Sequence, residues 1–267
     1  MLTSLPVLAI IVAHFTENWG FYTMLTELPT FLGNVMHYDI VRSEMCAQAS
    51  LLSAIPYLVV SFTVPLGGQL ADFIRRRGYL STTAVRKLFT CGAFLSQALF
   101  MTLAAVSSTP TGVIVCLVLA VGLGGLSSSG FSVNHLDVAP RVLHGLPYFF
   151  LVYNCFNLTN DDIFALKNTK RFQFAGVLMG ISNCIATIPG IISPTIAGHI
   201  TTHETQKEWQ LVFFISAAIY IVGAAFYGGL ASGERQPWAA QAEDYSPVVE
   251  SQTTSVDDLP APPPFGH

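Results

Sequence analysis

Long apolar runs recur along the chain, and short stretches between them hold most of its charges. Six of these runs approach the ~20 residues that a helix needs to cross a membrane. They cover residues 5–28, 48–71, 84–106, 111–133, 176–200 and 210–230. Because backbone polar groups in lipid must be satisfied within the segment, the pattern predicts six helical spans and an all-α membrane protein.

Composition supports a membrane protein and excludes several other classes. The 267 residues are 52% hydrophobic and only 10% charged, whereas about 25% of the residues of a soluble domain are charged. The net charge of −4, without a basic cluster large enough for a polyanion, argues against a nucleic-acid partner. The five cysteines are scattered and form no C-x-x-C pair, so we expect neither a metal site nor a disulfide framework. No nucleophile–base pair stands out, so we predict no enzyme and no cofactor.

Two segments depart from the pattern of spans. Residues 142–173 contain an apolar run too short to cross a membrane, followed by asparagines, aspartates and lysines. Residues 233–267 are polar and rich in proline, which is typical of a disordered tail. We therefore predict a six-span membrane domain over 1–232, with an atypical insert at 142–173, and a disordered tail over 233–267.

The distribution of lysine and arginine predicts the orientation. If Met1 is cytosolic, only Arg42 and Lys207 lie on the far side, and the remaining ten cations lie on the cytosolic side, as the positive-inside rule requires. Both termini are then cytosolic. The ten are Arg75, Arg76, Arg77, Arg86, Lys87, Arg141, Lys167, Lys170, Arg171 and Arg235.

The first span contains polar and ionisable residues, which are expensive in lipid and usually functional. His14, Glu17, Asn18 and Tyr22 recur at spacings of three and four, which favours one helix face. We take Glu17 and His14 as candidates for proton coupling and Asn18 and Tyr22 as candidates for lining a cavity. Two alternatives remain open: Glu17 as a structural carboxylate paired with a cation, and His14 as a packing histidine.

The fourth and fifth spans also contain polar residues. Ser128, Ser129 and Asn183 either line the same cavity or hold helices together through hydrogen bonds. At the cytosolic end of the fourth span, the sequence favours a structural or gating ion-pair network of His135, Asp137 and Arg141. Glycines and prolines in the fifth span, among them Pro189 and Pro194, mark bends.

The loop after the second span places Asp72 beside three arginines. Cations at the end of an apolar run anchor a helix at the cytosolic surface. A carboxylate near the membrane edge is costly unless it meets a cation. We assign this group a gating or structural role; its members are Asp72, Arg75, Arg76 and Arg77.

Six stretches together resemble one family. The most specific reads S-G-F-x-x-N-H-L-D-x-A-P, and the loop after the second span is similar to the loop signature of the major facilitator superfamily. The chain resembles the C-terminal half of the anion and sugar-phosphate cotransporters of that superfamily, over about 1–141 and 174–240. The matching stretches are His14–Thr23, Gly67–Arg77, Ser81–Lys87, Ser129–Pro140, Ala175–Asn183 and Ala231–Trp238.

The resemblance implies one six-helix half of a twelve-span fold that moves acidic substrates together with protons. Ser127–Ser132 and Ala186–Gly190 are similar to sialin. The vesicular glutamate transporters have an arginine at the position of Glu17, so a sialin-like substrate is favoured over glutamate. The expected partners are a small organic anion, protons, the lipid bilayer, and the missing N-terminal half or a second copy. The expected location is a lysosome, a vesicle or the plasma membrane.

Two departures from the family leave alternatives open. Only one six-span half is present, so a truncated isoform that binds a partner without transporting is the main alternative. A phosphate-type or glutamate-type member of the family is another. The segment 142–173 interrupts a region that is almost continuous in the family. This fits either a retained intron or an unusual exon, with Met1 as an internal start, or a lineage-specific loop.

Overall fold

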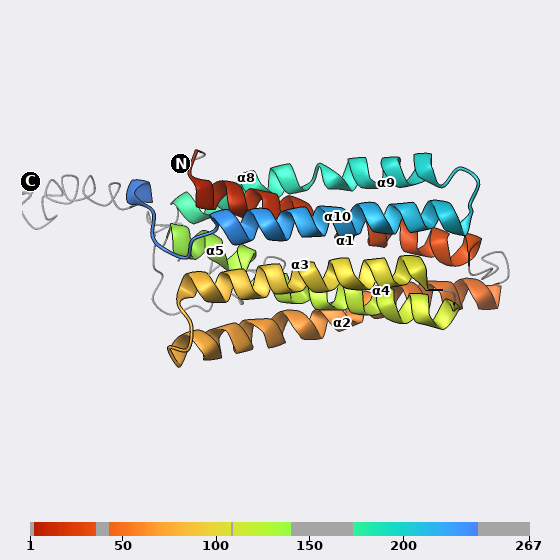
Figure 1. The fold of residues 1–267 in the computed structure, drawn as a ribbon, viewed down its shortest axis with the longest axis horizontal. Helices are drawn as coiled ribbons and strands as arrows, with labels where there is room; N and C mark the ends of the chain where they lie inside the picture. The colour runs from red at the N-terminus through yellow and green to blue at the C-terminus, as the bar shows by residue number, and fades with distance from the viewer. Residues whose placement is uncertain (1–2, 36–42, 108, 140–172, 240–267) are drawn as a thin grey trace, which may run out of the picture.

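The structure is a computed structural model that describes residues 3–35, 43–107, 109–139 and 173–239. Within these ranges the regular elements are helices that run side by side along the long axis of the molecule (Figure 1). They are α1 (Leu5–Asn34), α2 (Ser43–Arg76), α3 (Thr82–Val106), α4 (Pro110–Gly124), the 3-10 helix η1 (Gly125–Ser129), α5 (Phe131–Val138), α8 (Gln173–Ala186), α9 (Pro189–Ile200) and α10 (Gln206–Leu230).

Five stretches of the described residues are long and apolar enough to cross a membrane, which confirms a multi-pass membrane protein. They are Leu51–Arg76, Thr82–Val106, Pro110–Val138, Gly176–Ile200 and Gln206–Leu230. The predicted first span is not among these five. Its helix α1 has 30 residues and is long enough, but polar residues such as His14, Glu17 and Asn18 lower its hydropathy. The predicted number of six spans therefore stays a prediction.

The helices begin and end at polar residues. The Ser81 hydroxyl accepts a hydrogen bond from the backbone N–H of Ala84 at the start of α3. Thr205 and Glu208 form a reciprocal capping box at the start of α10. Arg75 and Arg76 lie in the last turn of α2, where cations interact favourably with the helix dipole. These signals place the turns at the two ends of the bundle.

Two of the spans are broken. In the fourth, α4 tightens into η1 before α5 begins at Phe131, although the sequence predicted one segment over 111–133. A Cβ at Gly130 would lie 2.7 Å from the carbonyl oxygen of Arg86, so α3 and the break approach more closely than any larger residue allows. In the fifth, α8 ends at Ala186 and α9 begins at Pro189, which has no N–H to continue the helix. This second break confirms the predicted bend.

The core lies between α1, α3, α4 and α10, and α2 and the pair α8–α9 flank it. Helix α10 contacts α3, α1 and α9, while α2 packs on α4 and η1. Aromatic side chains such as Phe94, Phe213 and Tyr220 fill the centre. Helix α2 instead exposes a row of large apolar side chains: Leu51, Ile55, Leu58, Phe62, Leu66, Leu70 and Phe73. That row faces away from the bundle, as expected of a surface that lipid or another protein covers.

The predicted insert at 142–173 and most of the predicted tail lie outside the described residues. Of the tail, the structure describes 233–239, and these residues lie against the helix ends. We call Ala231–Ala239 the terminal strap. Within it, Gly233 donates a backbone hydrogen bond to the Thr83 hydroxyl at 2.8 Å. The backbone N–H of Gln236 donates to the carbonyl oxygen of Val138 at 3.0 Å.

Candidate functional site

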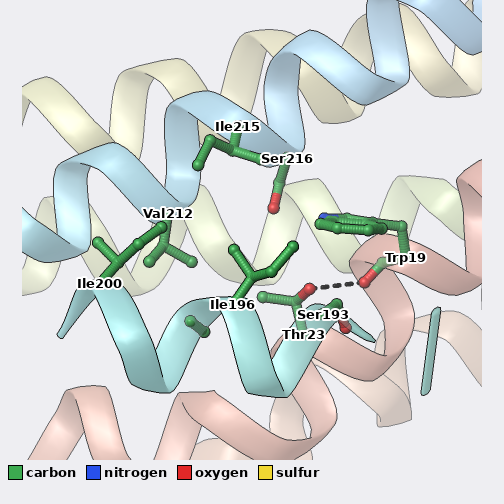
Figure 2. Close-up of a pocket in the computed structure, with 9 residues that line it drawn as sticks. Trp19, Thr23, Ser193, Ile196, Ile200, Val212, Ile215 and Ser216 are labelled. Carbon is green, nitrogen blue, oxygen red and sulfur yellow. Dashed lines mark hydrogen bonds between the residues drawn. The ribbon is translucent and has the colours of Figure 1, made fainter. Parts of the chain in front are cut away.

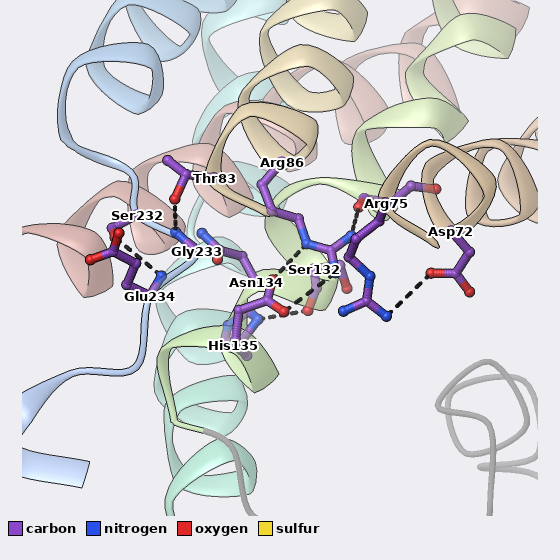
Figure 3. Close-up of polar contacts among 12 residues, drawn as sticks. Asp72, Arg75, Thr83, Arg86, Ser132, Asn134, His135, Ser232, Gly233 and Glu234 are labelled. Carbon is purple, nitrogen blue, oxygen red and sulfur yellow. Dashed lines mark hydrogen bonds and ion pairs between the residues drawn. The ribbon is translucent and has the colours of Figure 1, made fainter. Parts of the chain in front are cut away.

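A buried ion pair joins α3 to the broken fourth span (Figure 3). The Arg86 side chain is 3% exposed, and its Nε lies 2.6 Å from Oδ2 of Asp137. The same guanidinium donates to the Ser129 carbonyl oxygen at 2.7 Å, at the end of η1. One arginine therefore satisfies both a carboxylate and a carbonyl that the helix break leaves without an intrahelical partner.

Of the ion-pair network predicted at this end, Asp137 forms an ion pair within the described residues, with Arg86. Arg141, the predicted cation, lies outside the described residues. The structure supplies Arg86 instead, which the sequence had counted among the loop cations. Arg86 is inside the second turn of α3, because that helix begins at Thr82 and not at 84. His135 is also buried but contacts a different group.

His135 and His14 meet at one serine. The Ser182 hydroxyl oxygen lies 2.9 Å from Nε2 of His135 and 3.2 Å from Nδ1 of His14. The second ring nitrogen of His135, Nδ1, lies 2.9 Å from the carbonyl oxygen of Ser132. We call His14, Ser182 and His135 the histidine–serine bridge; it joins α1, α5 and α8. The sequence singled out both histidines but not Ser182, one of several serines in apolar helices.

Glu17 points into the bundle and contacts a neutral amide. The side-chain N–H of Gln97 on α3 donates to Oε2 of Glu17 at 3.1 Å, and Gln97 is 1% exposed. A Cβ at Gly124 would lie 2.9 Å from Oε1 of Glu17, so the glycine makes room for the carboxylate. No ion pair of Glu17 occurs within the described residues. Sequence reasoning missed Gln97, although an amide in the middle of an apolar helix is a usable signal.

Asn18 and Tyr22 face a different neighbour from Glu17. The Asn18 amide donates to the carbonyl oxygen of Ala186 at 2.7 Å, at the end of α8. A Cβ at Gly190 would lie 3.2 Å from the Tyr22 ring, so this ring packs against the start of α9. Residues four apart on a helix nearly align, whereas adjacent residues are about 100° apart. His14, Asn18 and Tyr22 therefore face α8 and α9 while Glu17 faces α3 and α4, and the expected single polar face is divided in two.

The remaining candidates for lining a cavity are not brought together. Ser129 is buried, and a Cβ at Gly67 would lie 2.9 Å from its hydroxyl oxygen, so Ser129 packs against α2. Ser128 is half-buried. Asn183 is exposed on α8, and its carbonyl oxygen accepts from the Thr187 hydroxyl at 2.6 Å. Their proposed contact with substrate stays a prediction.

The cations at the C-terminal end of α2 lie at the surface. Asp72 is 3.8 Å from Arg75 and from Arg76, and all three side chains are at least 44% exposed. The Arg77 guanidinium lies over the Phe73 ring, 5.3 Å from its centroid. At this exposure the pairs contribute little to stability, so their predicted gating role depends on a surface that they meet during transport.

A small cavity lies between α1, α9 and α10 (Figure 2). Its empty volume is about 180 Å³, and Trp19, Thr23, Ser193 and Ser216 line its polar part. The hydroxyls of Ser193 and Ser216 have no hydrogen-bond partner among the described residues. None of the residues predicted to bind substrate lines this cavity, and its volume is below the usual range for ligand pockets.

Comparison with known proteins identifies relatives of the chain. No family model matches it. Vesicular glutamate transporter 1 of Bos taurus is 41% identical over 241 residues, which are 90% of this chain and 36% of that protein. Vesicular glutamate transporter 2 of Homo sapiens is 40% identical over 237 residues, 89% of the chain and 34% of that protein. Vesicular glutamate transporter 2.1 of Danio rerio shows the same identity and coverage.

The chain thus spans about a third of the length of the curated relatives it matches. These relatives are transporters and not enzymes. Identity near 40% over nine tenths of the chain is far too high for a chance match of apolar helices. The chain is therefore homologous, over nine tenths of its own length, to about a third of the vesicular glutamate transporters, which are anion cotransporters of the major facilitator superfamily.

Proposed function

We propose that this chain is the C-terminal half of a proton-coupled transporter of small organic anions, with an acidic sugar as the favoured substrate. The observation that carries the proposal is the identity of 41% to a vesicular glutamate transporter over nine tenths of the chain. The preference for an acidic sugar rests on the resemblance of Ser127–Ser132 and Ala186–Gly190 to sialin, and on Glu17 where the glutamate transporters have an arginine. Vesicle or lysosome membranes are the proposed location.

The proposal requires that α1 also crosses the membrane, which adds one span to the five described above. Its 30 residues give a length of about 45 Å, enough to cross a bilayer. Its polar side chains bond to other helices: Glu17 to Gln97, Asn18 to the end of α8, and His14 to Ser182. Such contacts shield the polar groups from lipid, which makes the membrane position energetically acceptable.

The proposal also requires something to cover the bundle. Only 11% of the most apolar part of α2 is buried, and 28% of that of α8–α9. In a twelve-span transporter a second half covers part of this surface and lipid covers the rest. The exposed polar side chains Asn183 and Thr187 of α8–α9 are then available to a substrate bound between the halves.

Reconstitution in proteoliposomes tests the proposal. The chain is purified with and without a co-expressed N-terminal six-helix half taken from a full-length relative, and a proton gradient is imposed. We expect uptake of radiolabelled sialic acid above that of glutamate, only with the added half, and loss of uptake in Glu17→Gln. The exposed variant Cys184→Ala is the matched control and retains uptake.

Uptake by the chain alone contradicts the assignment as a half, and uptake that survives collapse of the gradient contradicts proton coupling. Glutamate uptake above sialic acid assigns the glutamate-type alternative. The second candidate function is a partner-binding membrane protein that does not transport, and the exposed apolar row of α2 favours it as a surface that another protein can cover. It predicts stable co-purification with the added half and no uptake of any of these anions.

A further inference from the structure

The histidine–serine bridge places one hydroxyl between two titratable rings from different helices. Ser182 is fully buried and His135 is 2% exposed, so bulk water does not reach the contact between them, whereas His14 is half-buried. The hydroxyl oxygen is 2.9 Å from Nε2 of His135, 3.2 Å from Nδ1 of His14 and 3.1 Å from the carbonyl oxygen of Met179. Three partners therefore share a group that has a single hydrogen to donate.

The hydrogen positions on His135 follow from its other contact. Its Nδ1 faces the Ser132 carbonyl oxygen at 2.9 Å, and a carbonyl oxygen only accepts hydrogen bonds (Figure 3). Nδ1 of His135 therefore bears a hydrogen. When this ring is neutral its Nε2 has none and needs a donor, which is the Ser182 hydroxyl.

The state of His14 then depends on that of His135. If Ser182 donates to His135, its oxygen has only lone pairs left, so Nδ1 of His14 must donate to it. If Ser182 donates to His14 instead, Nε2 of His135 must bear a hydrogen as well as Nδ1, and His135 is a cation. If Ser182 donates to the Met179 carbonyl oxygen, both rings must donate to the serine oxygen, and His135 is again a cation. The one hydroxyl hydrogen thus couples the protonation of two rings on α5 and α1.

We propose that Ser182 is a proton relay between His135 and His14. In the transfer, the Nε2–H bond of cationic His135 breaks and its hydrogen forms a new bond to the Ser182 oxygen. The Ser182 O–H bond breaks at the same time and that hydrogen forms a bond to Nδ1 of neutral His14. His135 becomes neutral, His14 becomes a cation and the serine is regenerated, so atoms and charge balance without another reactant.

This relay deepens the proposed proton-coupled transport and depends on it for its biological role. It gives protons a route from His135 on α5, near the end predicted to be cytosolic, to His14 in the first half of α1. Glu17, the other candidate for proton coupling, lies three residues further along α1 on the face toward α3.

The other titratable groups of the surrounding helices do not replace the relay. Arg86 of α3 and Asp137 of α5 pair with each other at 2.6 Å. Tyr227 of α10 accepts a hydrogen bond from Asn134 at 2.9 Å, and Cys184 of α8 is exposed. Glu17 of α1 bonds to an amide on α3. Within the described residues, Ser182 is the group that hydrogen-bonds to both histidines.

The test follows both rings by NMR of the whole chain in lipid nanodiscs, with ¹⁵N-labelled histidine. The titration midpoint of His135 is compared between the native chain and His14→Gln. We expect a difference of about one pH unit, the threshold above which two sites titrate as a coupled pair. Threonine and valine side chains have nearly the same shape, but only threonine has a hydroxyl. We therefore expect His14→Gln to shift the His135 midpoint in the Ser182→Thr background and not in the Ser182→Val background.

The controls separate a relay from a structural role. Ser193→Ala removes another buried serine hydroxyl and should leave the coupling intact. A difference that persists in the Ser182→Val background shows interaction through space alone and overturns the relay, as does its absence from the native chain. The NMR measurement does not depend on transport. Coupled titration of the two histidines without anion uptake therefore contradicts the proposed function only. Anion uptake without coupled titration contradicts the relay only. In the assembled transporter, Ser182→Val should lower gradient-driven uptake by more than about tenfold relative to Ser182→Thr.

Discussion

The pair of Arg86 and Asp137 shows how a single residue stabilises the weakest part of a helix. The guanidinium is almost fully buried and contacts both a carboxylate and the Ser129 carbonyl at the break in the fourth span. A buried pair of this kind adds little net stability over apolar residues, but either partner alone is costly. The ion pair therefore fixes the position of the helix break, and it contributes little to the net stability of the bundle.

Loss of Arg86 should destabilise the protein severely. Arg86→Gln leaves Asp137 buried without a cation, and we expect a loss of about 3–5 kcal/mol in the free energy of unfolding. The measurement is the thermal unfolding of the purified chain in detergent. Arg75→Gln is the matched control, because it removes an exposed pair 3.8 Å long.

A double variant sharpens this expectation. Asp137→Asn in the Arg86→Gln background removes the orphaned charge and should recover at least half of the lost stability. If Arg86→Gln unfolds at the same temperature as Arg75→Gln, the ion pair does not stabilise the fold.

At the scale of elements, close helix contacts depend on residues without side chains. A Cβ at Gly20 would overlap the hydroxyl oxygen of Tyr220, so α1 and α10 meet where α1 has only backbone. Tyr220 is 2% exposed and its ring lies 5.7 Å from that of Phe94 on α3. One tyrosine thus sets the separation of three helices.

Gly20→Ala should push α1 away from α10. Overpacking of this kind destabilises by about 1–3 kcal/mol, and we expect a matching fall in the unfolding temperature. Tyr220→Phe removes the oxygen that meets the new methyl group, so the variant with both changes should be more stable than Gly20→Ala alone. Gly92→Ala is the control, since nothing lies within 4 Å of a Cβ there. Equal unfolding temperatures for Gly20→Ala and Gly92→Ala contradict this contact.

Hydropathy predicts the helices better than it predicts their contacts. The apolar runs place five spans and the bend at Pro189, because span length and the missing proline N–H are local properties. The partners of Glu17, His14 and Asp137 are not local. Spacing tells which residues share a face of one helix, but not which helix that face meets. Gln97, Ser182 and Arg86 were therefore missed.

At the scale of the whole molecule, several chain segments meet at one end of the bundle. The Ser4 hydroxyl donates to the Gln236 side chain at 3.1 Å, just before α1 begins. Thr83 at the start of α3 and Val138 at the end of α5 contact the terminal strap as well. The positive-inside rule assigns all of these positions to the cytosol, and they lie together at one end of the bundle. Which side of the membrane this end faces stays a prediction.

Labelling of single cysteines tests that orientation. Tyr79→Cys and Ser232→Cys, each in a background without other cysteines, should react with a membrane-impermeant maleimide only after cells that display the chain at their surface are permeabilised. Thr202→Cys, in the turn between α9 and α10, should react in intact cells. The opposite pattern means that the chain is inserted the other way round.

The terminal strap also has a consequence for the order in which the protein is made. Its hydrogen bonds reach back to Ser4, Thr83 and Val138, segments that leave the ribosome well before it does. At roughly 5–20 residues per second, the ends of α1, α3 and α5 wait several seconds or more for their last partner. Until residue 239 emerges, that end of the bundle stays open. A ribosome that stalls before residue 239 therefore leaves a nascent chain in which the unpaired ends of these helices are accessible to quality-control factors.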